Sequence, residues 1–478
     1  MLFNSLDFAI FLPIVFILYW FVTQKSLKLQ NILIVVASYF FYGWWSKRFL
    51  ALILISTVLD YFVGRFLSNS NDKFKRKLLL VASLAVNLGF LGVFKYFNFF
   101  IDNFIAVFTF FGKEIQPNTL DIILPVGISF YTFQTLSYSI DIYRRKLEPT
   151  KDFIAFAAFV SFFPQLVAGP IERAKNLLPQ FYKKREFKYA QAIDGMRQIL
   201  WGLFKKVVIA DNCAQYADII FNNYTEYSGG YLILGALFFT FQIYGDFSGY
   251  SDIAIGTSRL FGFNLKRNFA FPYFSRDIAE FWRRWHISLS TWFRDYLYIP
   301  LGGSKGGTWK KIRNIFIIFV VSGFWHGANW TFIIWGALNA IYFIPLLLTK
   351  TNRKNTDDVA QGKLFPSYRE IFSMLSTFTL VVLGWVFFRS NSVPDAIGFL
   401  SRIFSAEQIA FPPELPLAIF VLLGIQLIVE WFQRSKQHGL EMSSENIPSI
   451  FRWLIYLALC MLIMAFLGKG TSFIYFQF

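Results

Sequence analysis

The chain has 478 residues, of which 55% are hydrophobic and 21% aromatic, and its formal net charge is +17. Soluble globular proteins are about 45–50% apolar, so the composition favours a membrane protein. The basic residues gather in short loops between apolar runs, as cytoplasmic loops do, and we therefore expect no nucleic-acid partner. The two cysteines, Cys213 and Cys460, stand far apart without neighbours at metal-ligand spacing, which indicates neither a disulfide framework nor a metal site.

Apolar runs recur along the whole chain, and each approaches the about 20 residues that a transmembrane helix needs. Clear examples are residues 8–22, 49–66, 78–94, 231–244, 332–348, 415–432 and 453–467. The first run has no basic region before it and no small-residue cleavage site after it, so it reads as a retained span rather than a signal peptide. We predict an all-α polytopic protein, a single integral-membrane domain over 1–478, with about 11 transmembrane helices plus re-entrant and interfacial helices.

The charges of the loops predict the topology. Basic loops are expected in the cytoplasm; they comprise residues 67–77, 144–151, 171–188, 264–313, 350–369 and 434–452. Residues 211–229 contain three acidic residues and no Lys or Arg, so we place them outside, together with both termini. Residues 350–370 read as a solvated loop, and residues 390–414, with three prolines, as a second connection.

Two apolar stretches are interrupted by proline and glycine, at residues 124–127 and 163–170. Irregular backbone at membrane depth is tolerated only where protein buries it or where it lines a watery cavity. The breaks therefore indicate either re-entrant segments around a central cavity or plain helix ends at the interface.

A polar cluster closes the apolar run 231–244. Asp246, Ser248 and Asp252 lie there, with Ser248 and Asp252 on one helical face. Uncompensated carboxylates at membrane depth are costly, so we expect these to pair with Arg or Tyr or to line a wet tunnel.

The chain has only three histidines, and two of them have tryptophan neighbours. Apolar residues at helical spacing predict an amphipathic interfacial helix over 278–293. His286 borders its apolar face beside Trp285, and it is either a packed residue or a catalytic one. The glycine-rich residues 302–307 lack P-loop spacing and read as a cytoplasmic turn, with a contact to donor phosphates as the minor alternative.

His326 follows seven consecutive apolar residues, and Trp325 precedes it. It lies between Gly323 and Gly327, and glycines four apart let another backbone approach closely. Burial keeps an imidazole neutral, and a neutral imidazole can act as a general base. If the helix continues, Asn329 could orient the ring; the alternative is a histidine hydrogen-bonded to a neighbouring helix for stability alone.

Seven segments together resemble the membrane-bound O-acyltransferases, in particular the bacterial branch that contains the alginate O-acetyltransferase membrane component. They are residues 1–5, 124–134, 162–171, 246–252, 281–289, 298–303 and 323–327. The resemblance implies a ring of membrane helices around a thinned centre, where a cytoplasmic funnel approaches an outer one. It matches His326 to the family's near-invariant histidine and His286 to its second, more variable polar position.

The resemblance also implies the chemistry: an acyl group moves from a thioester donor, acetyl-CoA or another acyl thioester, to a hydroxyl. The acceptor would be an alginate-like extracytoplasmic polysaccharide, finished by a serine-esterase-like partner, and the chain would lie in the lipid of a bacterial inner membrane. No cofactor would be bound permanently. Donor phosphates favour basic side chains, and the candidates are Arg283, Arg284, Lys305 and Lys310.

Three alternatives stay open. The chain could be a D-alanyl transfer protein of teichoic-acid modification, which draws on a carrier protein, or a component of peptidoglycan O-acetylation. It could also be a transporter without acyl chemistry, in which Asp246, Asp252 and His326 relay protons; the absence of repeat symmetry between the halves speaks against this.

Overall fold

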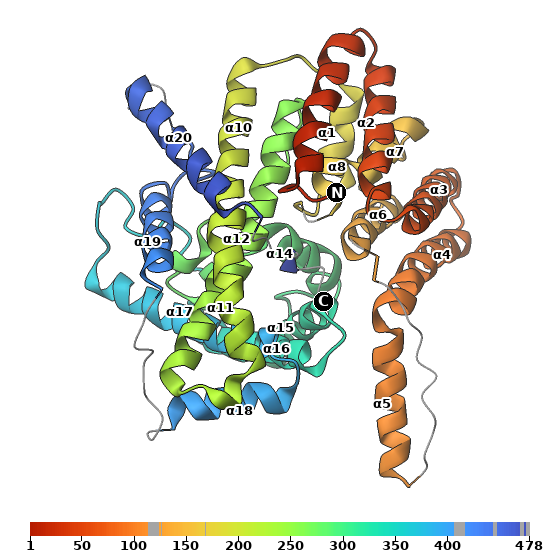
Figure 1. The fold of residues 1–478 in the computed structure, drawn as a ribbon. Helices are drawn as coiled ribbons and strands as arrows, with labels where there is room; N and C mark the ends of the chain where they lie inside the picture. Colours follow the sequence, from red (N-terminus) through yellow and green to blue (C-terminus); the bar gives the residue numbers. More distant parts are fainter. Residues whose placement is uncertain are drawn as a thin grey trace. The chain divides into compact units, whose positions relative to one another are not determined.

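The computed structural model describes residues 1–112, 124–125, 127–167, 169–405, 416–442, 447–468 and 473–474. Over these ranges the regular structure is helical and contains no strand, which confirms the all-α prediction (Figure 1). The chain divides into two compact units, Met1–Gly195 with Thr257–Lys266, and Met196–Gly256 with Arg267–Phe478. The single domain over 1–478 stays a prediction.

The first unit is built from the amino-terminal helices. Its elements are α1 (Leu6–Ile17), η1 (Leu18–Val22), α2 (Leu27–Gly43), α3 (Lys47–Asn69), α4 (Lys73–Leu91), η2 (Gly92–Tyr96), α5 (Phe97–Phe110), α6 (Ile128–Tyr143), α7 (Phe153–Ser161), α8 (Phe163–Leu166), α9 (Ala174–Leu177) and η3 (Leu178–Tyr182). Helices α10 (Tyr189–Leu203) and α12 (Gly229–Leu260) contain residues of both units.

The two predicted breaks are present in the first unit. Gly127 adopts a left-handed φ of +75° and precedes α6, and Phe162 interrupts the helix between α7 and α8. A Cβ at Gly127 would lie 2.7 Å from the backbone oxygen of Leu166, so only glycine fits there. Val126 and Ala168 lie outside the described residues, and a re-entrant path stays a prediction.

The second unit contains every candidate site residue. Besides its part of α10 and α12, it comprises η4 (Phe204–Ala210), α11 (Asp211–Asn222), η5 (Tyr224–Glu226), η6 (Pro272–Phe274), α13 (Ile278–Arg284), α14 (Ile287–Phe293), η7 (Arg294–Tyr298), α15 (Thr308–His326), α16 (Trp330–Leu348), α17 (Tyr368–Arg389), α18 (Val393–Phe404), α19 (Leu417–Phe432) and α20 (Ser449–Phe466). Helices α15 and α16 form an antiparallel pair joined by three residues.

Six helical stretches of the described chain are long and apolar enough to cross a membrane. They are Lys47–Asn69, Lys73–Phe110, Gly229–Leu260, Trp330–Leu348, Tyr368–Arg389 and Ser449–Phe466. In Ser449–Phe466 only 11% of the most apolar window is buried, so its apolar face needs lipid around it, whereas in Gly229–Leu260 the share is 89%. Together with four shorter apolar helices, these confirm a multi-pass membrane protein; the number of about 11 spans stays a prediction.

Two loop predictions need correction. The connection 390–414 contains helix α18, because Ser392 caps the Val393–Phe404 segment with its side chain; residues 406–414 lie outside the described part. The loop 350–370 is irregular up to Ser367, but it is not solvated throughout, since Val359 and Ala360 are buried.

The acidic residues of the segment 211–229 are weaker evidence for its side of the membrane than the sequence suggested. Asp211 forms an ion pair with Lys206, and Asp218 forms one with Arg389. Two of the three acids therefore balance basic residues from other elements. The assignment of this segment to the outside, and of both termini, stays a prediction.

Candidate active site

His286 lies at a break between two short helices, so the predicted continuous helix over 278–293 is wrong. Helix α13 ends at Arg284, Trp285 is extended, and His286 adopts φ +43° and ψ +54° before α14 begins. This left-handed conformation is uncommon for a residue with a Cβ. The neighbouring irregular segment 268–270 holds it: the Ala270 N–H donates to the Arg284 carbonyl (2.9 Å), and the Ile287 N–H donates to the Asn268 carbonyl (2.9 Å).

The His286 imidazole is fully buried among aromatic rings. Its centroid lies 4.6 Å from that of Phe247 on α12, in an edge-on arrangement. Burial lowers the pKa of His286 to about 3. The ring is therefore neutral at physiological pH, and its Nδ1 lies 3.2 Å from Oδ1 of Asn268.

His326 is the last residue of α15, and the predicted close approach of a second backbone is confirmed at Gly323, whereas Gly327 lies against the Phe332 ring. A Cβ on Gly323 would lie 2.2 Å from the Phe332 carbonyl oxygen on α16, and a Cβ on Gly336 would lie 2.4 Å from the Phe319 carbonyl oxygen. Only glycines permit this spacing. The His326 side chain is buried, with its ring 5.2 Å from the Trp335 ring.

The two predicted histidines come together. Their ring centroids are 6.5 Å apart, and the Trp325 ring lies 6.1 Å from that of His286 and 4.8 Å from that of His326. Residues 40 positions apart in the sequence thus share one site. Two imidazoles at this separation, inside an aromatic enclosure, can act on the same small reacting group.

Helices α16 and α17 complete the enclosure with residues that the sequence analysis missed. Trp385 stacks on Trp335 at 5.5 Å, and Phe388 lies 5.4 Å from the His326 ring. The predicted Trp285 supports this layer from behind, 5.0 Å from Trp385. Nothing in the sequence separates these aromatic residues from the many others of the apolar runs.

Asn329 does not orient His326, which corrects the prediction for it. Helix α15 stops at His326, and Gly327 is extended. Asn329 instead caps α16: its Oδ1 accepts from the Thr331 N–H (3.0 Å), and its Nδ2 donates to the Asn391 carbonyl (2.9 Å). Its contribution is to fix the short connection that follows His326.

The carboxylates of α12 pair with two lysines, not with the predicted Arg or Tyr. Lys205 contacts Asp252 (2.7 Å) and Ser248 (2.8 Å), while Lys206 contacts Asp246 (2.8 Å). Both lysines are buried. Pairing offsets part of the penalty for a charge in an apolar interior. The two lysines could have been found from the sequence, because they are adjacent basic residues inside the apolar stretch 199–210.

A short carboxy-terminal segment packs against the same helix. The Ile474 N–H donates to Oδ2 of Asp246 (2.6 Å), and the Phe473 ring lies 4.5 Å from that of Tyr250 and 6.2 Å from that of Phe247. Both Phe473 and Ile474 are buried. Because Phe247 also contacts His286, this segment belongs to the wall of the site.

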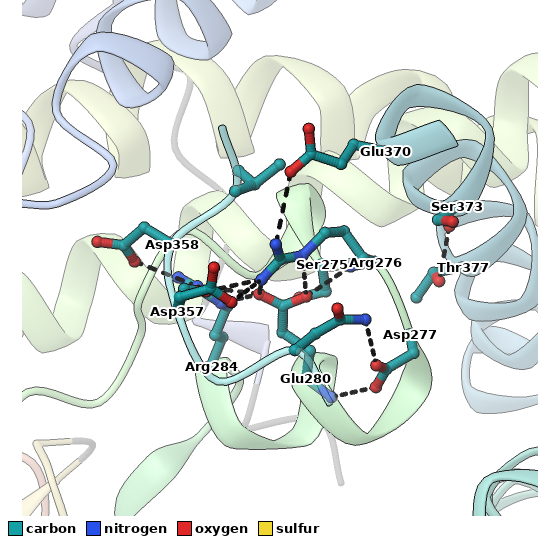
Figure 2. A network of polar contacts seen from close by, with 12 residues as sticks. Ser275, Arg276, Asp277, Glu280, Arg284, Asp357, Asp358, Glu370, Ser373 and Thr377 are labelled. Carbon is teal, nitrogen blue, oxygen red and sulfur yellow. Dashed lines mark hydrogen bonds and ion pairs between the residues drawn. The ribbon is translucent and has the colours of Figure 1, made fainter. Parts of the chain in front are cut away.

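Of the four basic candidates for donor binding, two are engaged in internal contacts. Figure 2 shows Arg276 and Arg284 converging on Glu280, and Arg284 also reaches Asp358 (3.2 Å) in the loop 350–367. Arg283 donates to two carbonyl groups of the same loop, at 2.9 and 2.6 Å. These arginines tie the loop to α13.

The other two candidates, Lys305 and Lys310, are exposed. Lys305 lies within the turn 302–307 and Lys310 follows it; in this turn Gly302 and Gly306 adopt φ values of +101° and +102°. The Gly303 N–H donates to the Tyr298 carbonyl of η7 (2.9 Å), and the Lys305 N–H donates to the Gly302 carbonyl (3.0 Å). Both N–H groups are thus already used, which favours a turn over a phosphate-binding loop.

Comparison with known proteins gives one family match and several relatives. Residues 45–375 match the membrane-bound O-acyltransferase family. The chain is 42% identical to a protein named probable alginate O-acetylase from Pseudomonas putida over 408 residues, 85% of this chain and 80% of that protein. It is 37% identical to a peptidoglycan O-acetyltransferase of Helicobacter pylori (84% and 79% covered), and 28% identical to a teichoic acid D-alanyltransferase of Streptococcus thermophilus (61% and 75%).

Proposed function

This chain belongs to the membrane-bound O-acyltransferase family and is a membrane-embedded O-acyltransferase, and on that premise we propose that it transfers acetyl groups from a cytoplasmic thioester to hydroxyls of an extracytoplasmic, alginate-like polysaccharide. The higher identity and coverage of the two O-acetylating relatives, compared with the D-alanyltransferase, favour acetyl as the group transferred. Peptidoglycan is the second candidate acceptor, because one of these relatives is named for it.

The observation that carries the proposal is the pair of buried imidazoles 6.5 Å apart. His326 takes the proton of an acceptor hydroxyl as its oxygen attacks the acyl carbon of the thioester. The carbon–sulfur bond then breaks, and His326 returns the proton to the leaving thiolate, so that an ester and a free thiol are formed. His286 either orients the thioester or positions the acceptor. The aromatic enclosure excludes water, which would otherwise hydrolyse the donor.

The acceptor route is supported by a cavity near the end of α17. It is lined by Phe221, Asn222, Tyr224, Arg389, Ser390, Asn391, Asp395 and Phe399. Asn391 accepts the hydrogen bond from Asn329, three residues after His326. Polar side chains line much of the cavity, as a sugar requires, and it adjoins the connection that follows the proposed base.

The test is His326→Ala, with His438→Ala as the matched control, since His438 is the third histidine and it too is buried. Loss of a general base lowers a rate by about 10²–10⁴-fold. We expect alkali-releasable acetate on the exported glycan to fall by that amount in His326→Ala and to stay near normal in His438→Ala. Membrane levels must be equal by immunoblot; normal acetylation by His326→Ala would exclude the mechanism.

For the donor we propose acetyl-CoA or another acyl thioester. Lys305 and Lys310 are the remaining candidates to meet its phosphates, because Arg283 and Arg284 are held by the loop 350–367. Purified protein supplied with acetyl-CoA and a hydroxyl acceptor should release free CoA without a carrier protein. Turnover only with a loaded carrier protein would favour D-alanyl-type chemistry instead.

We further propose that a serine-esterase-like partner on the outer side of a bacterial inner membrane completes the transfer to the polymer. In this scheme the membrane protein passes the acetyl group to a partner hydroxyl. Supplying a purified protein of this class with the membrane enzyme and acetyl-CoA should yield an acetylated serine, detectable by mass spectrometry; no acetylation of the partner would refute this step.

A further inference from the structure

Three contacts converge on the side-chain oxygen of Asn268, a buried residue that the family comparison does not single out. Oδ1 of Asn268 lies 3.2 Å from the Ser288 backbone nitrogen, 2.8 Å from the Ser288 hydroxyl and 3.2 Å from Nδ1 of His286. Its own backbone carbonyl accepts from the Ile287 N–H. Asn268 therefore contacts His286 and the two residues that follow it, Ile287 and Ser288.

These contacts determine the tautomer of His286. A backbone N–H can only donate, so the Asn268 atom facing Ser288 must be the carbonyl oxygen and not the amide nitrogen. A carbonyl oxygen can only accept, so Nδ1 of His286 must carry the hydrogen. Because the ring is neutral, its lone pair is left on Nε2.

We propose that Asn268 is a positioning residue that holds His286 with its hydrogen on Nδ1 and its lone pair on Nε2, so that His286 offers the reaction a hydrogen-bond acceptor. This deepens the proposed function and rests on it. A thioester carbonyl has no hydrogen to give. A sugar acceptor has further hydroxyls beside the one whose proton His326 takes, and one of these can donate to Nε2 of His286. His286 therefore serves the acceptor side of the reaction, and of the two roles left open above this selects positioning of the acceptor.

The chemistry of Asn268 fits this role better than that of aspartate. An aspartate at this position would favour the imidazolium form, which has no lone pair to offer. A neutral amide fixes the hydrogen on Nδ1 while leaving the ring uncharged in its apolar surroundings. Within the described part of the chain, the rings that contact His286 include those of Phe247, Phe269 and Trp325, which do not titrate, and that of His326, which does.

The first test reads the tautomer directly, without any activity. The chain has three histidines, so ¹⁵N-histidine labelling in detergent or lipid gives three ring spectra, assigned by His286→Gln, His326→Gln and His438→Gln. We expect a protonated Nδ1 and an unprotonated Nε2 for His286. In Asn268→Leu this single form should become a mixture. A hydrogen on Nε2 in the unmodified protein, or an unchanged tautomer in Asn268→Leu, would overturn the proposal.

The second test uses turnover. Asn268→Leu should lower kcat roughly 10–100-fold, as loss of a partner that orients a functional histidine does, with equal protein in the membrane. Asn268→Asp keeps an acceptor and should restore part of the rate; by raising the pKa of His286 it should also move the acid limb of the pH profile to higher pH. Ser288→Ala keeps the backbone donor and should stay near normal.

The outcomes separate the two proposals. Full activity of Asn268→Leu, with normal tautomer spectra, would end the role of Asn268 while leaving the histidine mechanism intact. Full activity of His326→Ala and His286→Ala would end the proposed function, whatever the tautomer. If Asn268→Leu does not accumulate, the pH profile of Asn268→Asp decides: an unshifted acid limb would contradict the proposal.

Discussion

The close packing of α15 on α16 gives a perturbation whose size can be worked out from the structure. In Gly323→Ala the new Cβ would meet the Phe332 carbonyl oxygen at 2.2 Å, whereas ordinary contact begins at 3.4 Å. The obstacle is backbone, so it cannot rotate away. The two helices must separate locally by roughly 1 Å to restore normal contact.

The displacement reaches the catalytic group because His326 lies three residues further along the same helix. Misplacing a reacting group by about 1 Å costs on the order of 10² in rate. We therefore expect Gly323→Ala to lower turnover of acetyl-CoA about 100-fold, with its KM changed much less.

The matched control is Gly384→Ala on α17, a buried glycine beside the same aromatic enclosure. Its Cβ would lie 3.5 Å from Trp335, which is ordinary contact. The assay is CoA release from acetyl-CoA in the presence of a hydroxyl acceptor, by purified proteins of equal concentration and equal monodispersity in detergent. Normal turnover by Gly323→Ala, or an equal loss in Gly384→Ala, would refute the reasoning from backbone spacing.

Two further predictions concern the charged contacts. Lys206→Met leaves two buried carboxylates without their cation, and breaking such pairs destabilises by about 3–5 kcal/mol; the variant should accumulate poorly and unfold at lower temperature. Arg294→Ala removes only an exposed ion pair and should be near normal, so equal thermal stability of the two would contradict this view. Arg284→Ala should free the loop 350–367 and speed its cleavage by trypsin roughly tenfold, as the loss of a charged hydrogen bond allows. Unchanged cleavage kinetics would show that the remaining contacts suffice.

The sequence by itself indicated that the chain lies in lipid, that its fold is all-α and that His286 and His326 are the candidate site histidines. Long apolar runs can satisfy their backbone only as helices in lipid, so an all-α membrane protein followed without any knowledge of packing. The glycines at 323 and 327 also predicted a close helix contact before either helix was placed, because only glycine leaves room for a second backbone.

Only the tertiary structure decided how the site is assembled. The periodicity of residues 278–293 predicted one helix, but the chain turns at His286. Hydrogen bonds with Asn268 and Ala270, which lie outside that segment, hold this turn. Periodicity shows which side chains are apolar. A helix break that leaves the same apolar side chains buried does not change this pattern, so the pattern cannot reveal it.

The partners of the buried charges were likewise beyond the sequence. Lys205 and Lys206 precede α12 by a whole helix, and their pairing with Asp246 and Asp252 follows from the way η4 lies against it. The same holds for Trp385 and Phe388, which differ from other aromatic residues only by their position. A one-dimensional pattern shows which residues must be buried, whereas the partner of each is set by contacts between segments far apart in the chain.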